Sequence, residues 1–257
     1  TASGLSPTPA GEALRPHAEA AEHALHAGRA ALRTFDAGPI APVRVALPAD
    51  MVELVLLPGL AAFADAHPAV ELVFDQRPGL ANLMRREADI AIRSVRPTDG
   101  EELLSMRLRP IQSAVFGRPS YLEAHPSLSP ADHRWIGWTQ DRSHLPDMAW
   151  LAEVAPQAKF ALRTTDGRTL RHAATAGVGL ALLPRVFGRV TPQLREVTLD
   201  GPPPPVADLW LVTHRALRHA PGVAELWTWL SDRLRPTHAD ETAWLRAQLA
   251  EAYGRSE

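Results

Sequence analysis

The chain alternates short apolar runs with longer stretches in which apolar side chains recur every three or four positions. In its first third, runs typical of strands cover residues 43–47, 71–74 and 89–92, and stretches typical of helices cover residues 51–66 and 80–87. The run at residues 89–92 is apolar enough to be buried on both faces of a sheet. Strands that alternate with helices predict a parallel sheet joined by right-handed crossovers.

The middle of the chain continues this alternation and predicts a second α/β unit. Strands are predicted at residues 113–116, 135–138, 160–163 and 180–184, and helices at residues 119–125, 147–154 and 167–176. Four consecutive prolines within residues 201–205 predict a stiff connector. Beyond it, the pattern predicts a strand at residues 209–213 and helices at residues 221–234 and 240–253.

A long helix is predicted before the first strand, from Thr8 to about Phe35. Thr8 suits the N-cap, Pro9 suits the first helical position, and Pro16 predicts a kink. Apolar residues spaced by three and four make a heptad seam, which includes Leu14, Ala18, Ala21, Leu25 and Leu32. The seam favours dimerisation, and a helix that lies on its own domain is the alternative.

Composition and charge narrow the class of protein. The 257 residues are 46% hydrophobic and 22% charged, which is typical of a globular chain of one or two domains. The formal charge of −2 argues against strong DNA binding by this chain alone, because such domains carry a positive face. No run of 18 apolar residues predicts a membrane span, and the first residues do not form a secretory signal.

Catalytic and metal-binding patterns are missing from the sequence. The chain has no cysteine, and its one lysine, Lys159, has no glycine-rich loop beside it. The serines lack the flanking glycines of a nucleophile elbow. His23 and His26 lie on one predicted helix without a third ligand, so a solvated helix face explains them better than zinc. We therefore expect no enzyme activity, no metal and no cofactor.

Several segments, in order along the chain, resemble LysR-type transcriptional regulators. Residues 8–14 resemble the segment that leaves the family's winged helix-turn-helix, and residues 176–184 resemble its alanine-glycine-x-glycine segment that ends in leucine-proline. Further similarity is carried by Leu57-Pro58 with Phe63 and His67-Pro68, and by residues 89–93. The resemblance runs from about residue 4 to residue 236 and leaves out the DNA-reading helix-turn-helix. That difference suggests a truncated chain, a proteolytic fragment or a natural remnant.

The resemblance implies an α/β fold of two Rossmann-like lobes, as in type 2 periplasmic binding proteins, preceded by a long linker helix. Residues 1–37 would hold the end of the DNA-binding wing and the dimerisation helix. Lobe I would comprise residues 43–110 and 206–236, and lobe II residues 111–205. Residues 237–257 would form a helical extension at the C-terminus.

The family binds its effector between the lobes, and strand ends and helix starts are where small anions bind. Asp50 and Met51 follow the first strand, where family members often carry Ser or Thr; an N-cap role is the alternative for Asp50. Gln76 and Arg77 follow the second strand, and Arg77 is either an effector ligand or a solvated turn residue that pairs with Asp75.

Five further residues, in three segments of the chain, complete the expected site. Arg93 and Ser94 follow the third strand, where the arginine needs either an effector anion or a structural carboxylate. In lobe II, Thr139 follows a strand, and Thr165 and Asp166 precede a helix. We expect these lobe II residues to act primarily as helix caps and secondarily as residues of the cleft. Both roles are compatible because the first N–H groups of a helix have no partner within the helix.

The resemblance implies a cytoplasmic regulatory domain that binds a small metabolite and forms a homodimer or homotetramer. It would contact DNA only through the missing helix-turn-helix and would not contact a membrane. A solute-binding protein of a transport system is the alternative, but it would need export and has no use for a heptad seam. An α/β hydrolase or transferase would need one of the motifs that the sequence lacks.

Overall fold

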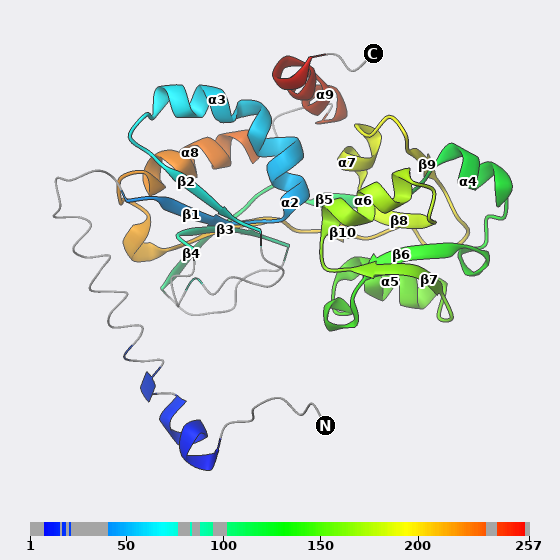
Figure 1. Cartoon of the computed structure of the whole chain (residues 1–257), viewed down its shortest axis with the longest axis horizontal. Helices are drawn as coiled ribbons and strands as arrows, with labels where there is room; N and C mark the ends of the chain where they lie inside the picture. The colour runs from blue at the N-terminus through cyan, green and yellow to red at the C-terminus, as the bar shows by residue number, and fades with distance from the viewer. Residues whose placement is uncertain are drawn as a thin grey trace.

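The structure, a computed structural model, describes residues 8–15, 17–18, 21, 41–76, 83, 88–94, 102–234 and 241–254. Figure 1 shows two α/β lobes side by side, with a helix near the C-terminus above them. The helix predicted at residues 80–87 lies outside the described residues, apart from a turn at Leu83. The part of the predicted long first helix beyond Ala21 also lies outside them. Residues 9–15 are helical, and the Thr8 hydroxyl accepts the Gly11 N–H at 3.2 Å, which confirms the predicted N-cap.

Lobe I is built on a five-stranded sheet in the order β2-β1-β3-β11-β4. Its strands are β1 (Val43–Ala46), β2 (Leu72–Asp75), β3 (Ile90–Arg93), β4 (Leu103–Arg107) and β11 (Trp210–His214). The predicted parallel pairing of the first three strands is confirmed. Strand β11 comes from the far end of the chain and inserts between β3 and β4, antiparallel to both. Helix α8 (Val223–Leu234) follows it and buries Leu226 and Leu230 in the lobe I core.

One helical stretch joins β1 to β2. It consists of α2 (Ala49–Met51), the π-helical turn η1 (Val52–Leu56) and α3 (Leu57–Ala66). It begins two residues before the predicted start, since Pro48 occupies the N-cap position in an extended conformation. Pro58 has no N–H to donate to a carbonyl of the preceding turn. This missing hydrogen bond accounts for the wider, π-helical geometry of the backbone at η1.

Lobe II is built on a six-stranded sheet in the order β10-β5-β8-β6-β7, with β9 paired to β5. The strands are β5 (Ile111–Gly117), β6 (Arg134–Trp138), β7 (Lys159–Thr164), β8 (Leu180–Pro184), β9 (Arg195–Val197) and β10 (Val206–Ala207). The helices are α4 (Pro119–Ala124), α5 (Pro146–Val154), α6 (Gly167–Thr175) and α7 (Arg185–Arg189). Separate apolar clusters, one around Trp135 and Trp150 and one around Phe116 and Leu170, pack on this sheet.

The chain crosses between the lobes twice. It leaves lobe I after β4 and enters lobe II at β5. It returns after β10, which pairs with β5 of lobe II, so we place the return after Ala207 rather than at residue 206. The Pro204 carbonyl accepts from the Gln112 side chain at 3.1 Å, which holds the proline connector against lobe II.

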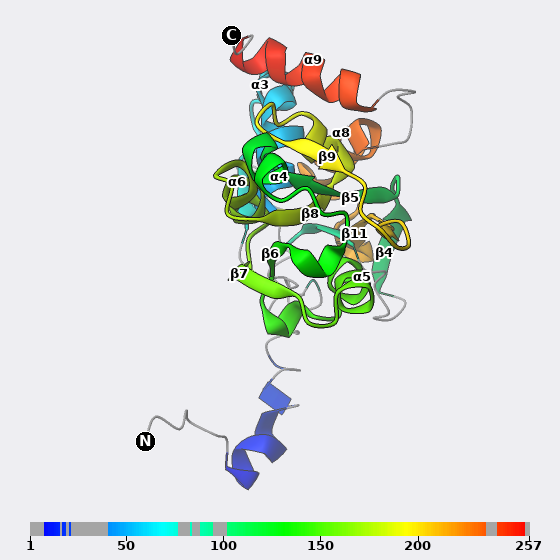
Figure 2. The ribbon, with the colours of Figure 1, turned by 90° about the vertical axis from the view of Figure 1, so that its right-hand side faces the viewer.

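Helix α9 (Glu241–Tyr253) lies across the top of the molecule. It packs on α3 and η1 of lobe I and on α7 of lobe II. Figure 2, turned by 90°, again shows α9 beside α3. The sequence pattern predicted this helix but not what it packs against.

Candidate functional site

The expected site residues of lobe I lie at one edge of its sheet. Because β1, β2 and β3 are parallel, the residues that follow them emerge at the same edge. Gln76 and Ser94 are exposed there, whereas Arg93 is half-buried at the end of β3, opposite Trp210. Arg77 lies outside the described residues. The described residues of this set therefore share one sheet edge, and their role in effector binding stays a prediction.

The expected site residues of lobe II lie together at the ends of two parallel strands. Trp138 and Thr164 are paired in β6 and β7, and the Thr139 N–H donates to the Thr164 carbonyl at 3.1 Å. Thr165 and Asp166 follow directly. Asp166 is the N-cap of α6, since its carboxylate accepts the N–H of Arg168 at 3.3 Å and of Thr169 at 3.1 Å. The predicted capping role of Asp166 is confirmed.

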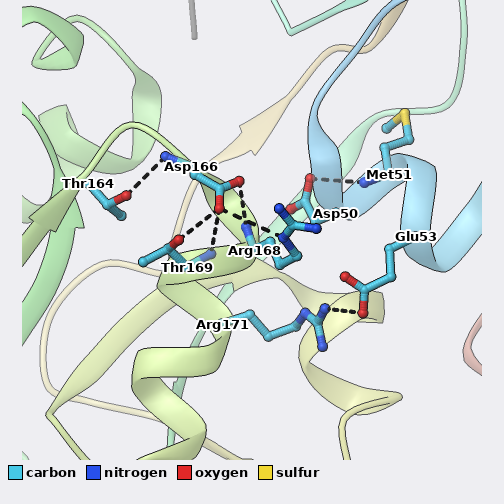
Figure 3. Close-up of polar contacts among 8 residues, drawn as sticks. All are labelled: Asp50, Met51, Glu53, Thr164, Asp166, Arg168, Thr169 and Arg171. Atoms are coloured by element: carbon cyan, nitrogen blue, oxygen red, sulfur yellow. Dashed lines mark hydrogen bonds and ion pairs between the residues drawn. The ribbon is translucent and has the colours of Figure 1, made fainter. Parts of the chain in front are cut away.

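The two edges meet where α2 of lobe I contacts α6 of lobe II. The side chain of Asp50 lies against Gly167, the first residue of α6: a Cβ on Gly167 would come within 2.8 Å of Asp50 Oδ2. Asp50 is 7% exposed, and its Oδ1 accepts the Met51 N–H at 2.9 Å. Figure 3 shows this carboxylate beside the start of α6. Asp50 thus accepts a backbone N–H at a helix start, although the N-cap itself is Pro48.

Burial raises the pKa of Asp50 to about 6 from 3.8. Desolvation is the main cause, because it penalises the charged carboxylate, and the nearby Asp166 acts in the same direction. The Met51 N–H and the Arg171 guanidinium act in the opposite direction without cancelling the rise. The lobes therefore meet around a carboxylate that changes its charge near neutral pH.

A second contact between the lobes was not predicted. Arg171 on α6 donates from Nη2 to Glu53 Oε1 on η1 at 2.7 Å. The Arg171 side chain is 9% exposed and the Glu53 side chain 35% exposed. A signal for Arg171 was present, since it shares the buried face of α6 with Leu170 and Ala174. An arginine on an apolar helix face needs a buried partner, and here the partner belongs to the other lobe.

A cavity of about 240 Å³ lies on the hinge side of these contacts, between the lobes and beneath α9. Of the expected site residues that the structure describes, Met51 alone lines it. The others lie at the sheet edges, where neither their exposure nor their contacts show a preformed pocket. The cavity was missed because α7 and α9, which help to form its walls, are brought there only by tertiary packing.

Two structural findings bear on function class. In the part of the chain that the structure describes, no three His, Asp or Glu side chains gather where they could hold a metal ion. Likewise, no helix within the described residues has the length and apolar character to cross a membrane.

Sequence comparison identifies relatives of this chain. Residues 36–235 match the family model described as the LysR substrate binding domain. The HTH-type transcriptional regulator PgrR of Escherichia coli (strain K12) is 26% identical over 210 residues, covering 77% of this chain and 69% of PgrR. The HTH-type transcriptional regulator CrgA of Neisseria meningitidis serogroup C (strain 8013) is 28% identical over 175 residues, covering 63% of this chain and 58% of CrgA.

Solved structures share the fold. The regulatory domain of CrgA superposes with a TM-score of 0.63 at 21% identity, over 76% of this chain and 98% of that domain. The effector binding domain of QuiR in complex with shikimate gives a TM-score of 0.58 at 14% identity, over 76% of this chain and 97% of that domain. The two lobes thus have the expected α/β fold of the type 2 periplasmic-binding-protein class.

Proposed function

Since this chain belongs to the LysR substrate binding domain family, we propose that it senses a small-molecule effector bound between its lobes. It is the regulatory domain of a LysR-type transcriptional regulator, and its relatives are transcription regulators rather than enzymes or transport proteins. In the proposed mechanism, the effector shifts the balance between arrangements of the lobes. That shift changes how the regulator acts on DNA.

The observation that carries the proposal is the polar contact between the lobes. Asp50 against Gly167 and Arg171 with Glu53 hold α2 and η1 against α6. Such polar contacts can be exchanged for water or a ligand at lower cost than the apolar contacts that join the lobes at Phe187. An effector that binds one arrangement more tightly than the other then shifts their populations by its differential affinity. QuiR supports this scheme, because its effector binding domain holds shikimate.

The proposed effector-facing residues remain those at the two sheet edges. Asp50 and Met51 belong to α2, Thr165 and Asp166 directly precede α6, and the contact between these two helices supports the choice of these four residues. The wider proposed set consists of Gln76, Arg77, Arg93, Ser94 and Thr139. Met51 gives the set a link to the cavity, because it belongs to both.

We also propose that the regulator acts as an oligomer and reads DNA through a helix-turn-helix that this chain does not include. PgrR and CrgA are HTH-type regulators, and the matches span 69% and 58% of their lengths. Part of the proposed dimerisation seam lies within the described residues, and its side chains there are exposed. Leu14 is 63% exposed, and Ala18 and Ala21 are also exposed. Leu25 and Leu32 lie outside the described residues. An exposed seam supports pairing with a second copy, and sedimentation of residues 1–257 against residues 41–257 tests it.

A thermal-shift screen of the chain with a metabolite library tests the sensing function. A ligand that binds the native state alone raises the free energy of unfolding by about 2.7 kcal/mol at about 100 times its Kd. Small-angle scattering with and without the hit then reports whether the lobes move. If no metabolite stabilises the chain, or if hits leave the scattering profile unchanged, the proposed mechanism is wrong.

Substitutions at the lobe I edge test the residue assignment with the same hit. Arg77→Ala and Arg93→Ala should weaken binding by roughly ten- to a hundredfold if each arginine makes a charge-assisted bond to the effector. Arg195→Ala, an exposed arginine on β9, is the matched control.

A further inference from the structure

Helix α9 connects the two lobes in a way that the family match does not cover. The match ends at residue 235, and α9 begins at Glu241. From there, Leu245 is buried in the lobe I core at 1% exposure, and the same core includes Phe187 of lobe II. Arg246 donates to the Arg189 carbonyl of lobe II at 2.6 Å. One helix therefore contacts both lobes at the hinge.

Arg233 fixes α9 in place on the lobe I side. Its Nε donates to the Val55 carbonyl at 2.6 Å, and its Nη2 donates to the Gln248 side chain on α9 at 3.0 Å. Its guanidinium lies 5.5 Å from the ring centroid of Trp229 on α8 and 5.3 Å from that of Trp244 on α9. Such a set of directed bonds and cation–π contacts gives α9 one position rather than a loose attachment.

The cavity beneath α9 is enclosed by four parts of the chain. Val55 comes from η1, Pro110 from the crossing between the lobes, Phe187 from α7, and Trp244 and Leu245 from α9. Its volume is about 240 Å³. Apolar and aromatic walls of this kind suit a small organic molecule better than a chain of waters.

The polar part of the cavity wall carries positive charge. Arg185 and Arg189 on α7 both line the cavity, and they share one carboxylate, that of Glu196. Arg185 lies 2.9 Å from Glu196 Oε1, and Arg189 lies 2.7 Å from Glu196 Oε2. Glu196 offsets one of these two guanidinium charges, and a third arginine, Arg109, also lines the cavity, with its guanidinium 5.8 Å from the ring centroid of Trp244. Among the lining residues that the structure describes there is no Asp or Glu.

We propose that this cavity binds a small organic anion with an apolar body, such as an aromatic or branched carboxylate. The anion would lie toward Arg185 and Arg189, and the apolar body against Phe187, Trp244 and Leu245. The inference rests on the proposed sensing function and names its ligand class. Because the cavity walls come from both lobes and from α9, a bound anion would fix the lobes and α9 together. The part of the wall supplied by α9 lies outside residues 36–235, which match the family model.

The absence of cysteine allows a direct test without knowledge of the natural ligand. Thr242→Cys places a single thiol in the cavity wall, and Ala247→Cys places one on an exposed position of the same helix. Each thiol is alkylated by iodoacetate, an anion, and by iodoacetamide, its neutral counterpart of similar size. In both reactions the thiolate displaces iodide, so the ratio of the two rates reports the local preference for an anion.

The expected result is a rate ratio of iodoacetate to iodoacetamide about fivefold higher at position 242 than at position 247, and reduced by added salt. Arg185→Gln in the Thr242→Cys background lowers the positive charge of the cavity wall and should reduce this preference, with Arg189→Gln as a second variant. Arg195→Gln removes an exposed positive charge of lobe II and should leave it unchanged. Phenylacetate should slow alkylation at position 242, whereas phenylacetamide should not.

Equal rate ratios at the two positions, or no protection by phenylacetate up to about 10 mM, would overturn the inference. The outcome is separable from that of the sensing function. A screened metabolite that stabilises the chain without protecting position 242 would remove the cavity as the site and leave the function standing. If the cavity prefers anions but no metabolite stabilises the chain, the cavity assignment stands and the proposed sensing function is wrong.

Discussion

The carboxylate of Asp50 lies against Gly167, so that the first residue of α6 has room for a hydrogen but not for a methyl group. This relationship joins the start of a helix in lobe I to the start of a helix in lobe II. It makes one buried carboxylate part of the contact that sets how closely the lobes approach.

The stability of the chain should depend on pH through Asp50. Folding raises the pKa of Asp50 from 3.8 to about 6, so the folded state binds more protons than the unfolded state between these values. The contribution of Asp50 to stability is therefore full below about pH 4 and is lost as the pH rises through 6. Asp50→Asn should be about 2–3 kcal/mol more stable than the wild type at pH 7.5, since each pKa unit corresponds to about 1.4 kcal/mol.

Urea unfolding of both proteins at pH 5 and pH 7.5 measures this difference. The advantage of Asp50→Asn should shrink at pH 5, where the wild-type carboxyl is mostly protonated. The charged groups that face Asp50 are Arg171 and Asp166, and both are common to the two proteins. A variant that is less stable than the wild type at pH 7.5 would show that the start of α6 stabilises the ionised carboxylate.

Gly167→Ala should force the lobes apart at this contact. The new Cβ would lie 2.8 Å from Asp50 Oδ2, and overpacking of this kind typically costs about 1–3 kcal/mol. Asp50→Ala in the same chain should remove the clash and restore most of the loss. A double-mutant cycle by denaturant unfolding measures the coupling, and simple additivity of the two substitutions would contradict the packing argument.

Glu53→Gln should weaken the second contact between the lobes. It removes the charge that pairs with Arg171, whose side chain is 9% exposed, while Glu53 itself is 35% exposed. Partial exposure screens the pair, so we expect a loss of about 1–2 kcal/mol rather than the larger cost of breaking a fully buried pair. Glu123→Gln, on an exposed face of α4, should change the unfolding free energy by less than about 0.5 kcal/mol. Equal effects of the two variants would argue that the bond at 2.7 Å contributes no stability.

Leu245→Ala should destabilise the chain by about 2–5 kcal/mol, because Leu245 is 1% exposed in the lobe I core. Tyr253→Ala, at a position of α9 that is 60% exposed, is the control. Thermal unfolding followed by tryptophan fluorescence compares the two, since Trp229 and Trp244 both contact Arg233 at the α9 attachment. An unchanged melting temperature in Leu245→Ala would mean that α9 is not an integral part of lobe I.

Local sequence signals sufficed for most strands and helices of the fold. Alternation and buried apolar runs located β1, β3 and β8, and the left-handed Gly177 ends α6 as its place after the apolar stretch predicted. Strand β4 was missed because its outer residues Ser105 and Arg107 are exposed at the sheet edge and show little apolar character. Its strand state depends on pairing with β11, more than a hundred residues later.

Contacts that depend on packing between distant segments of the chain could not be predicted from the sequence. Asp50 and Asp166 could be proposed from the sequence because helix starts carry a local signature, and Thr139 because it follows a clear strand. Arg171 was missed because its partner, Glu53, is 118 residues away. The same limit hid the cavity, whose walls combine Val55, Phe187 and Trp244 from three distant segments.

The double crossing between the lobes has a consequence for how the chain is made. Lobe II is a continuous segment, from β5 at Ile111 to β10 at Ala207, whereas the sheet of lobe I is complete only when β11 inserts between β3 and β4. During synthesis from the N-terminus, β3 and β4 are made more than a hundred residues before β11, the strand that pairs with both. Lobe II can therefore complete its sheet on the ribosome while β3 and β4 still have open edges, and the period before β11 emerges is when a nascent chain is most exposed to mispairing.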